Sequence, residues 1–367
     1  MGELILHIGT PKTGTTSLQK FLFDNRDTLL KNGVDFVQFT PQKEKIFAST
    51  YLRNGRFLSE YCKKIASHNP SRKQLDYFEE NYQRLSKSLN GKQKILLSDE
   101  NFYYYSCLPF KGISNPGHYW RELFRIVDEL GAKNITLIVY LRRQDEYVVS
   151  QWKELIKNGY TAKSLKEFLN HPPVKCMLDY ASNIKAIRDS FNNNANIIVR
   201  SYNQVAFSGT DIYHDFCESL GIEWDDDYKI PEIRLNESIT FDMAEALRTC
   251  KYGGGVHFIE KKRVRNMLAV ALSSKHKEPR EITIFSPGEA EALMQQYSDG
   301  NRRISEEYCD KRSLFSEEYK ERSIWKPNRL RIFMYRFAFL WPKLALKIYS
   351  GSKNKYTTGK KNEACNP

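Results

Sequence analysis

Residues 9–17, Gly-Thr-Pro-Lys-Thr-Gly-Thr-Thr-Ser, combine one cation with glycines and hydroxyl side chains in a pattern suited to binding an anion. The apolar run 4–8 before them predicts a buried strand, and residues 18–23 predict the start of an amphipathic helix. Such a strand–turn–helix directs backbone N–H groups and the positive end of a helix at a phosphate or sulfate. The predicted anion-binding residues are Pro11, Lys12, Thr13, Gly14, Thr15, Thr16 and Ser17.

The position of the lysine distinguishes this loop from an ordinary nucleotide-binding P-loop. Gly9 and Gly14 have the separation of the Walker A glycines, and Thr16 takes the place of its hydroxyl residue. Thr15, however, stands where the Walker A lysine belongs, and Lys12 lies two residues before Gly14. A cation there meets the terminal group of the bound anion from another direction. The alternatives are a turn that binds nothing and an ordinary NTPase.

Arg142 and Ser150 form a second candidate site. Residues 135–141 predict the strongest strand of the chain, and a helix is expected from about Glu146 to Lys157. If Arg142 ends that strand, Ser150 lies two turns into the helix, and both side chains can return to one rim. A guanidinium and a hydroxyl suit a phosphate monoester. The alternative is a surface network in which Arg142 or Arg143 pairs with Asp145 or Glu146 and Ser150 faces solvent.

Together the two motifs resemble sulfotransferases that use 3′-phosphoadenosine-5′-phosphosulfate (PAPS). The segments HIGTPKTGTTSLQ and YLRRQDEY are similar to the bacterial, saccharide-modifying branch of that family. The resemblance covers roughly residues 1–320. It implies that Lys12 contacts the sulfuryl group and the leaving oxygen, that residues 13–17 hold the 5′-phosphate, and that Arg142 and Ser150 hold the 3′-phosphate. Ser17 departs from many cytosolic members, which carry tryptophan there, and their histidine base and late R-K-G segment have no counterpart.

Glu100 is the predicted catalytic base, because it ends the segment 95–100, whose first residues predict a buried strand, and resembles the S-x-E glutamate of the glycan-modifying branch. Partial burial would raise its pKa toward a useful value. His7 is the competitor, although a histidine on a buried strand is more often a core residue, and Asp99 is expected to cap or orient. The same run also fits a Walker B strand holding Mg²⁺, which leaves a kinase or ATPase as the alternative. Residues 225–227 would be the metal ligands of a glycosyltransferase, but an acidic turn is the simpler interpretation.

The order of apolar runs and helical patterns predicts an α/β fold, with a mostly parallel P-loop-type sheet flanked by helices and a helical C-terminal part. Strands are expected at 34–37, 94–98 and 196–200 besides those named above. Lys12, Glu100 and Arg142 all follow strand ends, where parallel sheets bind their ligands. We expect one domain over 1–320, a basic aromatic helix over 321–349 and a disordered tail over 350–367.

The net charge of +13 is concentrated near the C-terminus. Residues 320–367 contain twelve Lys or Arg against two Glu, so the rest of the chain carries only about +3 and is not a general nucleic-acid binder. Within 329–349, basic and aromatic side chains alternate at helical spacing, which suits either an anionic membrane surface or a helix packed on the domain. A non-catalytic membrane-binding module is therefore a further alternative.

No uncharged apolar run reaches the length of a transmembrane helix, no signal peptide is apparent, and the scattered cysteines favour a reducing compartment. We therefore expect a cytoplasmic protein, peripheral on the inner face of the membrane if 329–349 binds lipid. The sequence predicts sulfuryl transfer from PAPS to a hydroxyl or amine of a saccharide, either a polysaccharide or a glycolipid, by in-line displacement. No metal is expected.

Overall fold

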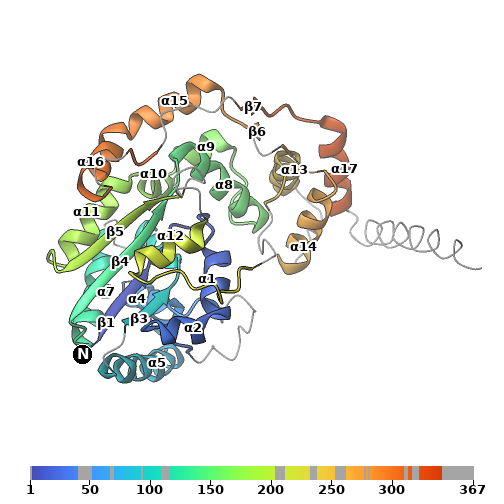
Figure 1. The fold of residues 1–367 in the computed structure, drawn as a ribbon. Helices are drawn as coiled ribbons and strands as arrows, with labels where there is room; N and C mark the ends of the chain where they lie inside the picture. Colours follow the sequence, from blue (N-terminus) through green and yellow to red (C-terminus); the bar gives the residue numbers. More distant parts are fainter. Residues whose placement is uncertain are drawn as a thin grey trace, which may run out of the picture. The chain divides into compact units, whose positions relative to one another are not determined.

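The apolar runs of the sequence form a five-stranded, wholly parallel sheet in the order β2-β3-β1-β4-β5. Figure 1 shows β3, β1, β4 and β5 side by side. The strands are β1 (Glu3–His7), β2 (Val34–Asp35), β3 (Lys94–Ser98), β4 (Asn134–Leu141) and β5 (Ala195–Ser201). The structure, a computed structural model, describes residues 2–39, 52–66, 70–91, 94–108, 116–202, 211–231, 238–252, 262–276, 278–279, 282–309, 313–315 and 322–340. The predicted fold class is confirmed, because parallel strands alternate with helices.

The strand register brings the carboxyl ends of the three central strands to one edge. His7, the last residue of β1, lies opposite Ser98 at the end of β3 and Ile138 of β4. β4 continues three residues further beside β5, to Leu141. The segments that follow β1, β3 and β4 therefore all leave the sheet at the same edge, as expected for residues 9–17, Glu100 and Arg142.

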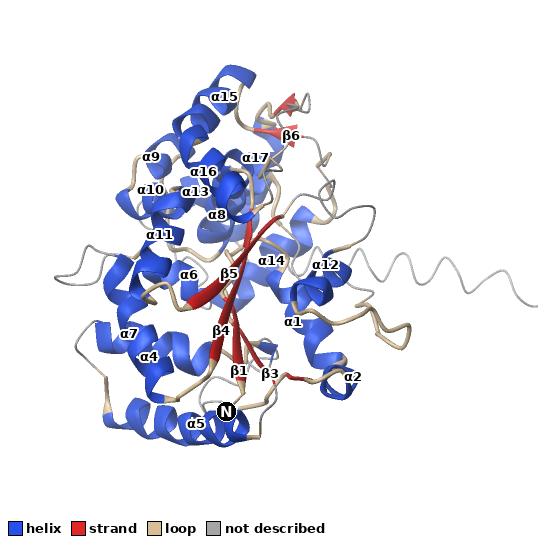
Figure 2. Cartoon of the chain, turned by 60° about the vertical axis from the view of Figure 1, so that its left-hand side comes forward, coloured by secondary structure: helices blue, strands red, loops and turns tan. Residues whose placement is uncertain are grey.

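Helices cover both faces of this sheet. Figure 2 shows α1 and α12 on one side of the strands and α4, α7 and α11 on the other. On the first side, Leu18 and Phe21 of α1 and Phe216 of α12 pack with Ile5 and Ile138 in one buried cluster. The helices of this part are α1 (Thr15–Asp24), α2 (Arg26–Lys31), α4 (Arg56–Ala66), α5 (Arg72–Asn90), α6 (Asn101–Ser106), α7 (Pro116–Glu129), α10 (Pro172–Leu178), α11 (Tyr180–Ser190), α12 (Ile212–Ser219), α15 (Pro287–Gln296) and α16 (Ser298–Tyr308).

Close contacts divide the chain into two compact units. The first unit, residues 1–148, 169–236 and 287–320, contains the whole five-stranded sheet. The second unit consists of residues 149–168, 237–286 and 321–367, and α8 (Gln144–Lys157) begins in the first unit and continues into it. The predicted division at residue 320 concerns folding domains and stays a prediction. The other elements are α9 (Leu165–Leu169), α13 (Phe241–Tyr252), α14 (Lys262–Ser273), α17 (Arg329–Leu340), β6 (Ile282–Thr283) and β7 (Ser323–Ile324).

The second unit is held together by the carboxyl groups of Asp242, which is buried, and of Glu278, which is half-buried, and by a parallel pairing of β6 with β7. Glu278 accepts hydrogen bonds from Lys153 Nζ at 3.0 Å and from the backbone N–H of Phe241. Asp242, on α13, accepts from Trp325 Nε1 and from Arg331 Nη1, each at 3.1 Å. These bonds fix α17 against α13. The predicted helical C-terminal part is confirmed by the helices from α13 to α17. Residues 341–367 lie outside the described residues.

Among the described residues, no helix combines the length and apolar character needed to cross a bilayer.

Candidate functional site

The loop between β1 and α1 has an unusual backbone. Gly9, Lys12 and Gly14 all have positive φ, at 76°, 70° and 72°. Glycine adopts this conformation readily, whereas a lysine there is strained by about 1–3 kcal/mol. Strained residues of this kind are concentrated at ligand-binding and active sites. The strain therefore lies at the one lysine of the predicted anion-binding loop.

The loop is anchored to the end of β4 by hydrogen bonds to its backbone. Thr10 donates twice to the carbonyl of Tyr140, from its N–H at 3.1 Å and from Oγ1 at 2.9 Å. Thr13 Oγ1 donates to the carbonyl of Thr10 at 2.6 Å, so this hydroxyl shapes the loop. The start of the loop is thus bound to β4 two residues before Arg142, which follows that strand.

Helix α1 begins at Thr15 with its N-terminal N–H groups directed toward this loop. Its N-cap residue is Gly14, which offers no side chain, and no carboxylate lies in the first turn. Backbone N–H groups at such an end have no partner within the helix, and they stabilise an anion together with the helix dipole. A phosphate or sulfate placed there would meet no local negative charge from the helix itself.

Arg142 lies against the loop. Its Nη1 donates to the backbone carbonyl of Lys12 at 3.3 Å, and its own carbonyl accepts from the Tyr180 hydroxyl at 2.7 Å. Its guanidinium stands 5.8 Å from the ring centre of Tyr202. The two motifs that the sequence analysis linked through one ligand therefore touch in the folded chain.

The ion pairs considered as the alternative are present as well. Arg142 Nε donates to Glu146 at 3.0 Å, and Arg143 Nε donates to Asp145 at 3.2 Å. Arg142 thus keeps one edge on Glu146 while another contacts the loop. Ser150 is half-buried on α8 in the second unit, and its proximity to Arg142 stays a prediction.

Glu100 follows β3 and lies next to the start of the loop. A Cβ added to Gly9 would come within 2.7 Å of Glu100 Cβ, so glycine is required for this close approach. The Glu100 side chain is only 17% exposed, and Gln19 Nε2 donates to its carboxylate at 3.0 Å. Arg53 Nη2 lies 3.3 Å from its other oxygen. The structure therefore brings Glu100 to the loop with its carboxylate already oriented.

Asp99 and Arg53 form a buried ion pair beside Glu100. Asp99 is fully buried and accepts from Arg53, through Nε at 2.8 Å and through Nη2, and from Ser59 Oγ at 2.5 Å. Burial raises the pKa of Asp99, and the Arg53 charge opposes that rise. For Arg53, burial lowers the pKa but the charges of Asp99 and Glu100 outweigh it, so the guanidinium stays protonated. Asp99 orients Arg53, and Arg53 orients Glu100.

His7, the competing base, is buried in the sheet. Its Nδ1 shares a hydrogen bond with Ser98 Oγ at 2.8 Å, and its Nε2 has no hydrogen-bond partner among the described residues. Its ring makes an edge contact with Phe216 at 5.2 Å. Burial lowers the pKa of His7 to about 3, so it is neutral at physiological pH. A fully buried ring enclosed by aromatic residues is a core residue, in agreement with the simpler interpretation of the sequence.

Three residues of the site escaped the sequence analysis: Gln19, Arg53 and Tyr202. Gln19 follows the loop on α1, and an amide two residues beyond Ser17 could have been considered as a partner of Glu100. Arg53 lies forty-six positions before Asp99 and follows no strand, so its sequence context carries no signal. Tyr202 comes directly after β5, and that strand end was the only available indication.

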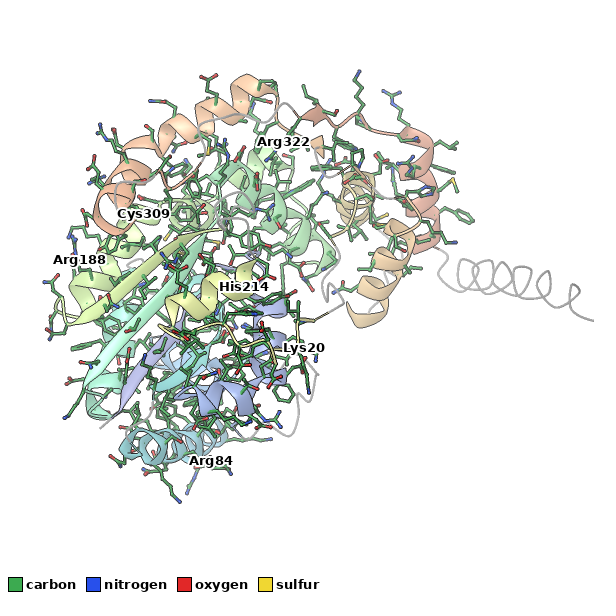
Figure 3. The ribbon with its side chains drawn as sticks, in the orientation of Figure 1. Lys20, Arg84, Arg188, His214, Cys309 and Arg322 are labelled. Carbon is green, nitrogen blue, oxygen red and sulfur yellow. The ribbon has the colours of Figure 1, made fainter. Side chains whose placement is uncertain are left out.

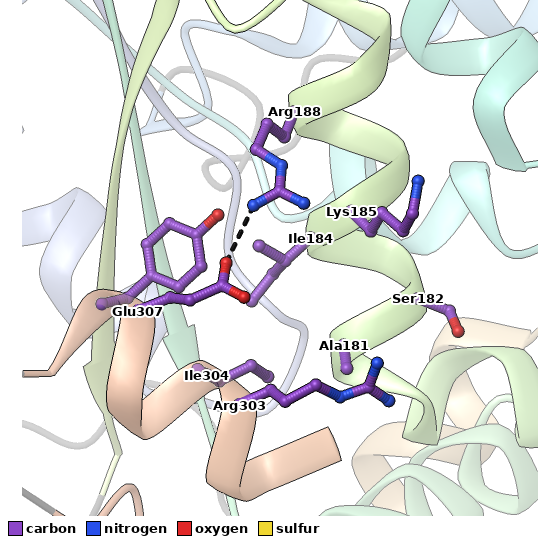
Figure 4. Close-up of a pocket in the computed structure, with 9 residues that line it drawn as sticks. Ala181, Ser182, Ile184, Lys185, Arg188, Arg303, Ile304 and Glu307 are labelled. Atoms are coloured by element: carbon purple, nitrogen blue, oxygen red, sulfur yellow. Dashed lines mark hydrogen bonds and ion pairs between the residues drawn. The ribbon is translucent and has the colours of Figure 1, made fainter. Parts of the chain in front are cut away.

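Other polar features of the described residues fit a nucleotide poorly. Asp225 accepts from the backbone N–H of Asp227 at 2.9 Å within a turn, as the acidic-turn interpretation expects. A cavity of about 90 Å³ lies between α11 and α16, crossed by the Arg188–Glu307 pair at 2.8 Å (Figure 4). Ligand pockets usually measure about 300–1,000 Å³, so this cavity is too small for a nucleotide.

No family model matches the chain. An uncharacterized protein of Archaeoglobus fulgidus is 25% identical over 202 residues, which are 54% of this chain and 53% of that protein. The match thus spans about half of the relative's length. Among solved structures, a sulfotransferase from Alicyclobacillus acidocaldarius is similar with a TM-score of 0.38 and 14% identity, covering 68% of this chain and 90% of the other. The activity of this chain therefore has to be argued from its own residues.

Proposed function

We propose that the chain is a sulfotransferase that moves a sulfuryl group from PAPS to a hydroxyl or amine of a saccharide. One observation carries the proposal: Arg142 Nη1 contacts the carbonyl of Lys12 at 3.3 Å, which joins the two segments expected to hold opposite ends of one donor. A doubly phosphorylated adenosine needs two separate anion sites, and the helix end at Gly14 and the Arg142 guanidinium offer both. The choice of a saccharide acceptor rests on the sequence resemblance alone.

The residues around the loop suit an in-line displacement at sulfur. In that reaction the acceptor oxygen or nitrogen bonds to sulfur, and the bond between sulfur and the phosphate oxygen breaks. The Lys12 ammonium would stabilise the negative charge that grows on this leaving oxygen. The N–H groups of residues 13–16 would hold the 5′-phosphate. Preorganised donors of this kind are worth about 3–4 kcal/mol each at a transition state.

Glu100 would accept the proton of the acceptor. Its carboxylate is oriented by Gln19 and Arg53, so one geometry is held before the acceptor binds. The proximity of Glu100 to Gly9 keeps the base next to the loop that carries Lys12. A base positioned in this way typically contributes about 10²–10⁴-fold to the rate.

The kinase or ATPase alternative is weaker, because a guanidinium already occupies the place where its magnesium would be needed. That alternative requires Asp99 or Glu100 to hold Mg²⁺ at the end of β3. Arg53 binds Asp99 and contacts Glu100, so both carboxylates already have a buried cation beside them. A divalent cation there would have to displace Arg53 or be repelled by it.

Titration with adenosine 3′,5′-bisphosphate, against ATP with Mg²⁺, tests the donor. We expect the bisphosphate to raise the melting temperature and to bind more tightly in calorimetry than ATP with Mg²⁺ does. Lys12→Ala and Arg142→Ala should each weaken bisphosphate binding by about tenfold or more, since each removes a charged hydrogen bond worth about 1.5–3 kcal/mol. Stronger stabilisation by ATP with Mg²⁺ would favour the kinase.

Neighbouring cations provide matched controls. Arg143 is adjacent to Arg142 but pairs with Asp145, and Lys20 lies on the surface of α1 beside Asp24 (Figure 3). Arg143→Ala and Lys20→Ala should leave the affinity within about twofold. Glu100→Gln should keep bisphosphate binding and lose acceptor-dependent release of the bisphosphate from PAPS, measured over a panel of saccharides. Unchanged release in Glu100→Gln would remove Glu100 from the mechanism.

A further inference from the structure

Helix α17 of the second unit is apolar on two opposite sides. One side packs on α13, with Tyr335, Ala338 and Phe339 only 4%, 8% and 2% exposed (Figure 1). Arg331 pairs with Asp242 at 3.1 Å and holds the helix in this orientation. The residues that face α13 therefore account for one apolar side of α17, and another explanation is needed for the side that faces solvent.

The solvent side, which we name the exposed apolar face, consists of Leu330, Phe333, Met334 and Phe337. Their exposed fractions are 71%, 65%, 57% and 39%. They follow the i, i+3, i+4, i+7 spacing of one helical stripe. Large apolar side chains gathered in one exposed patch mark an interaction site. The exposed apolar face therefore predicts an apolar partner.

Two arginines border this face along a groove. The groove has a volume of about 540 Å³ and is lined by α17, by the segment before α17 and by α13, whose Glu245 lies in the lining and pairs with Arg248. Arg329 and Arg336 both line it, seven residues apart, together with Phe333 of the exposed apolar face. Both arginines are exposed at the surface. Cations and apolar side chains thus meet along one seam of the same helix.

The charge of this region selects the kind of partner. Residues 322–340 contain five Lys or Arg and no Asp or Glu, and residues 341–367 add six Lys against one Glu. A second copy of the chain would place this face on itself in a two-fold dimer, so that cations would meet cations. The basic C-terminal residues of the same chain would repel it likewise. A partner that is apolar inside and negative at its surface matches both the exposed apolar face and the positive charge around it.

We propose that α17 docks on a membrane of anionic phospholipid. The exposed apolar face enters the boundary between headgroups and acyl chains, and Arg329 and Arg336 contact the headgroup phosphates along the groove. Helices that lie in the interface have this distribution of apolar and basic residues. Each Lys or Arg near an anionic membrane strengthens binding by about fivefold.

Vesicle sedimentation of the full-length chain tests the proposal without any assay of activity. The chain is mixed with vesicles of phosphatidylcholine alone or of equal parts phosphatidylcholine and phosphatidylglycerol. We expect binding to the anionic vesicles only, weakened by added salt because surface charges are screened. Leu330→Ser with Phe333→Ser should abolish binding, and Arg329→Gln with Arg336→Gln should weaken it by about tenfold or more.

The controls use exposed residues of the first unit. Leu30→Ser with Leu75→Ser removes apolar side chains that are 43% and 39% exposed, and Arg84→Gln with Arg302→Gln removes two surface cations. Both pairs should bind vesicles as the unchanged chain does, and melting curves verify that every variant is folded. Equal binding to both vesicle types, no binding to either, or equal loss in the controls would overturn the proposal. Dimerisation in sedimentation velocity that Leu330→Ser with Phe333→Ser abolishes would show a second copy as the partner and also overturn it.

Discussion

Replacing Arg53 by leucine tests the buried ion pair that orients the proposed base. The Asp99 side chain is fully buried and that of Arg53 is only 16% exposed. Removing one partner of such a pair leaves the other charge buried without compensation, which costs about 3–5 kcal/mol. Ser59 Oγ still donates to Asp99 in the variant. We therefore expect Arg53→Leu to lower the free energy of unfolding in urea by about 3 kcal/mol, at the lower end of that range.

A second substitution and the pH dependence make this prediction specific. Asp99→Asn removes the charge that Arg53→Leu leaves behind, so the double variant should be more stable than Arg53→Leu alone. Without the guanidinium, burial raises the pKa of Asp99 further, and the folded state binds a proton that the unfolded state has released. The protonated Asp99 therefore adds to the free energy of unfolding below about pH 4, and this addition is lost as the pH rises. The instability of Arg53→Leu should therefore be smallest in acid.

Arg56→Leu is the matched control, because Arg56 lies three residues along the chain and its partner Glu60 is part-exposed. A partly exposed pair of this kind contributes about 0.3–0.5 kcal/mol. The reasoning is refuted if Arg53→Leu costs less than about 1 kcal/mol, or if Asp99→Asn fails to restore stability in its background.

Three further predictions concern the edge of the sheet. Gly9→Ala should destabilise the fold by about 2–3 kcal/mol, because alanine is strained at a φ of 76° and its Cβ would lie 2.7 Å from Glu100 Cβ; an unchanged urea midpoint would contradict this. Burial lowers the pKa of His7 to about 3 from 6.5, so its contribution to stability is complete above pH 6.5 and is lost by roughly 1.4 kcal/mol per pH unit as the pH falls toward 3. The melting temperature of His7→Asn should therefore change less with pH over this range than that of the unchanged chain. The same pH dependence in both proteins would refute the assignment. Glu146→Gln should tighten binding of adenosine 3′,5′-bisphosphate several-fold in calorimetry by removing the charge that pairs with Arg142, whereas weaker binding would show that Glu146 orients the guanidinium.

The parts of the site that follow strand ends could be predicted, because a parallel sheet brings those ends to one edge whatever the intervening sequence. The apolar runs predicted the ends of four strands to within one residue, whereas the second strand is two residues shorter than expected (34–35 rather than 34–37). The meeting of the loop with Arg142 and Glu100 follows from this geometry and from the close approach that Gly9 allows. Residues placed by periodicity and topology were therefore accessible to sequence reasoning.

Contacts made between distant segments were not accessible. Nothing in the sequence around Arg53 distinguishes it from its neighbour Arg56, and only the folded chain places it on Asp99. The C-terminal helix shows the same limit. Its pattern of aromatic residues predicts a helix, but helical spacing alone does not tell which apolar side packs on α13 and which side, with Phe333, faces solvent.

The two arginines of the site differ in what an incoming anion must displace. Arg53 is held by Asp99, which is fully buried, so an anion would have to break a desolvated pair to reach it. Arg142 is held by Glu146, whose side chain is 21% exposed and can turn toward water. A phosphate can therefore replace Glu146 on Arg142 at small cost, whereas Glu100 keeps its contact with Arg53. The two ion pairs thus divide the site. The pair of Arg142 with Glu146 can give way to a ligand, and the pair of Arg53 with Asp99 keeps the proposed base in one position.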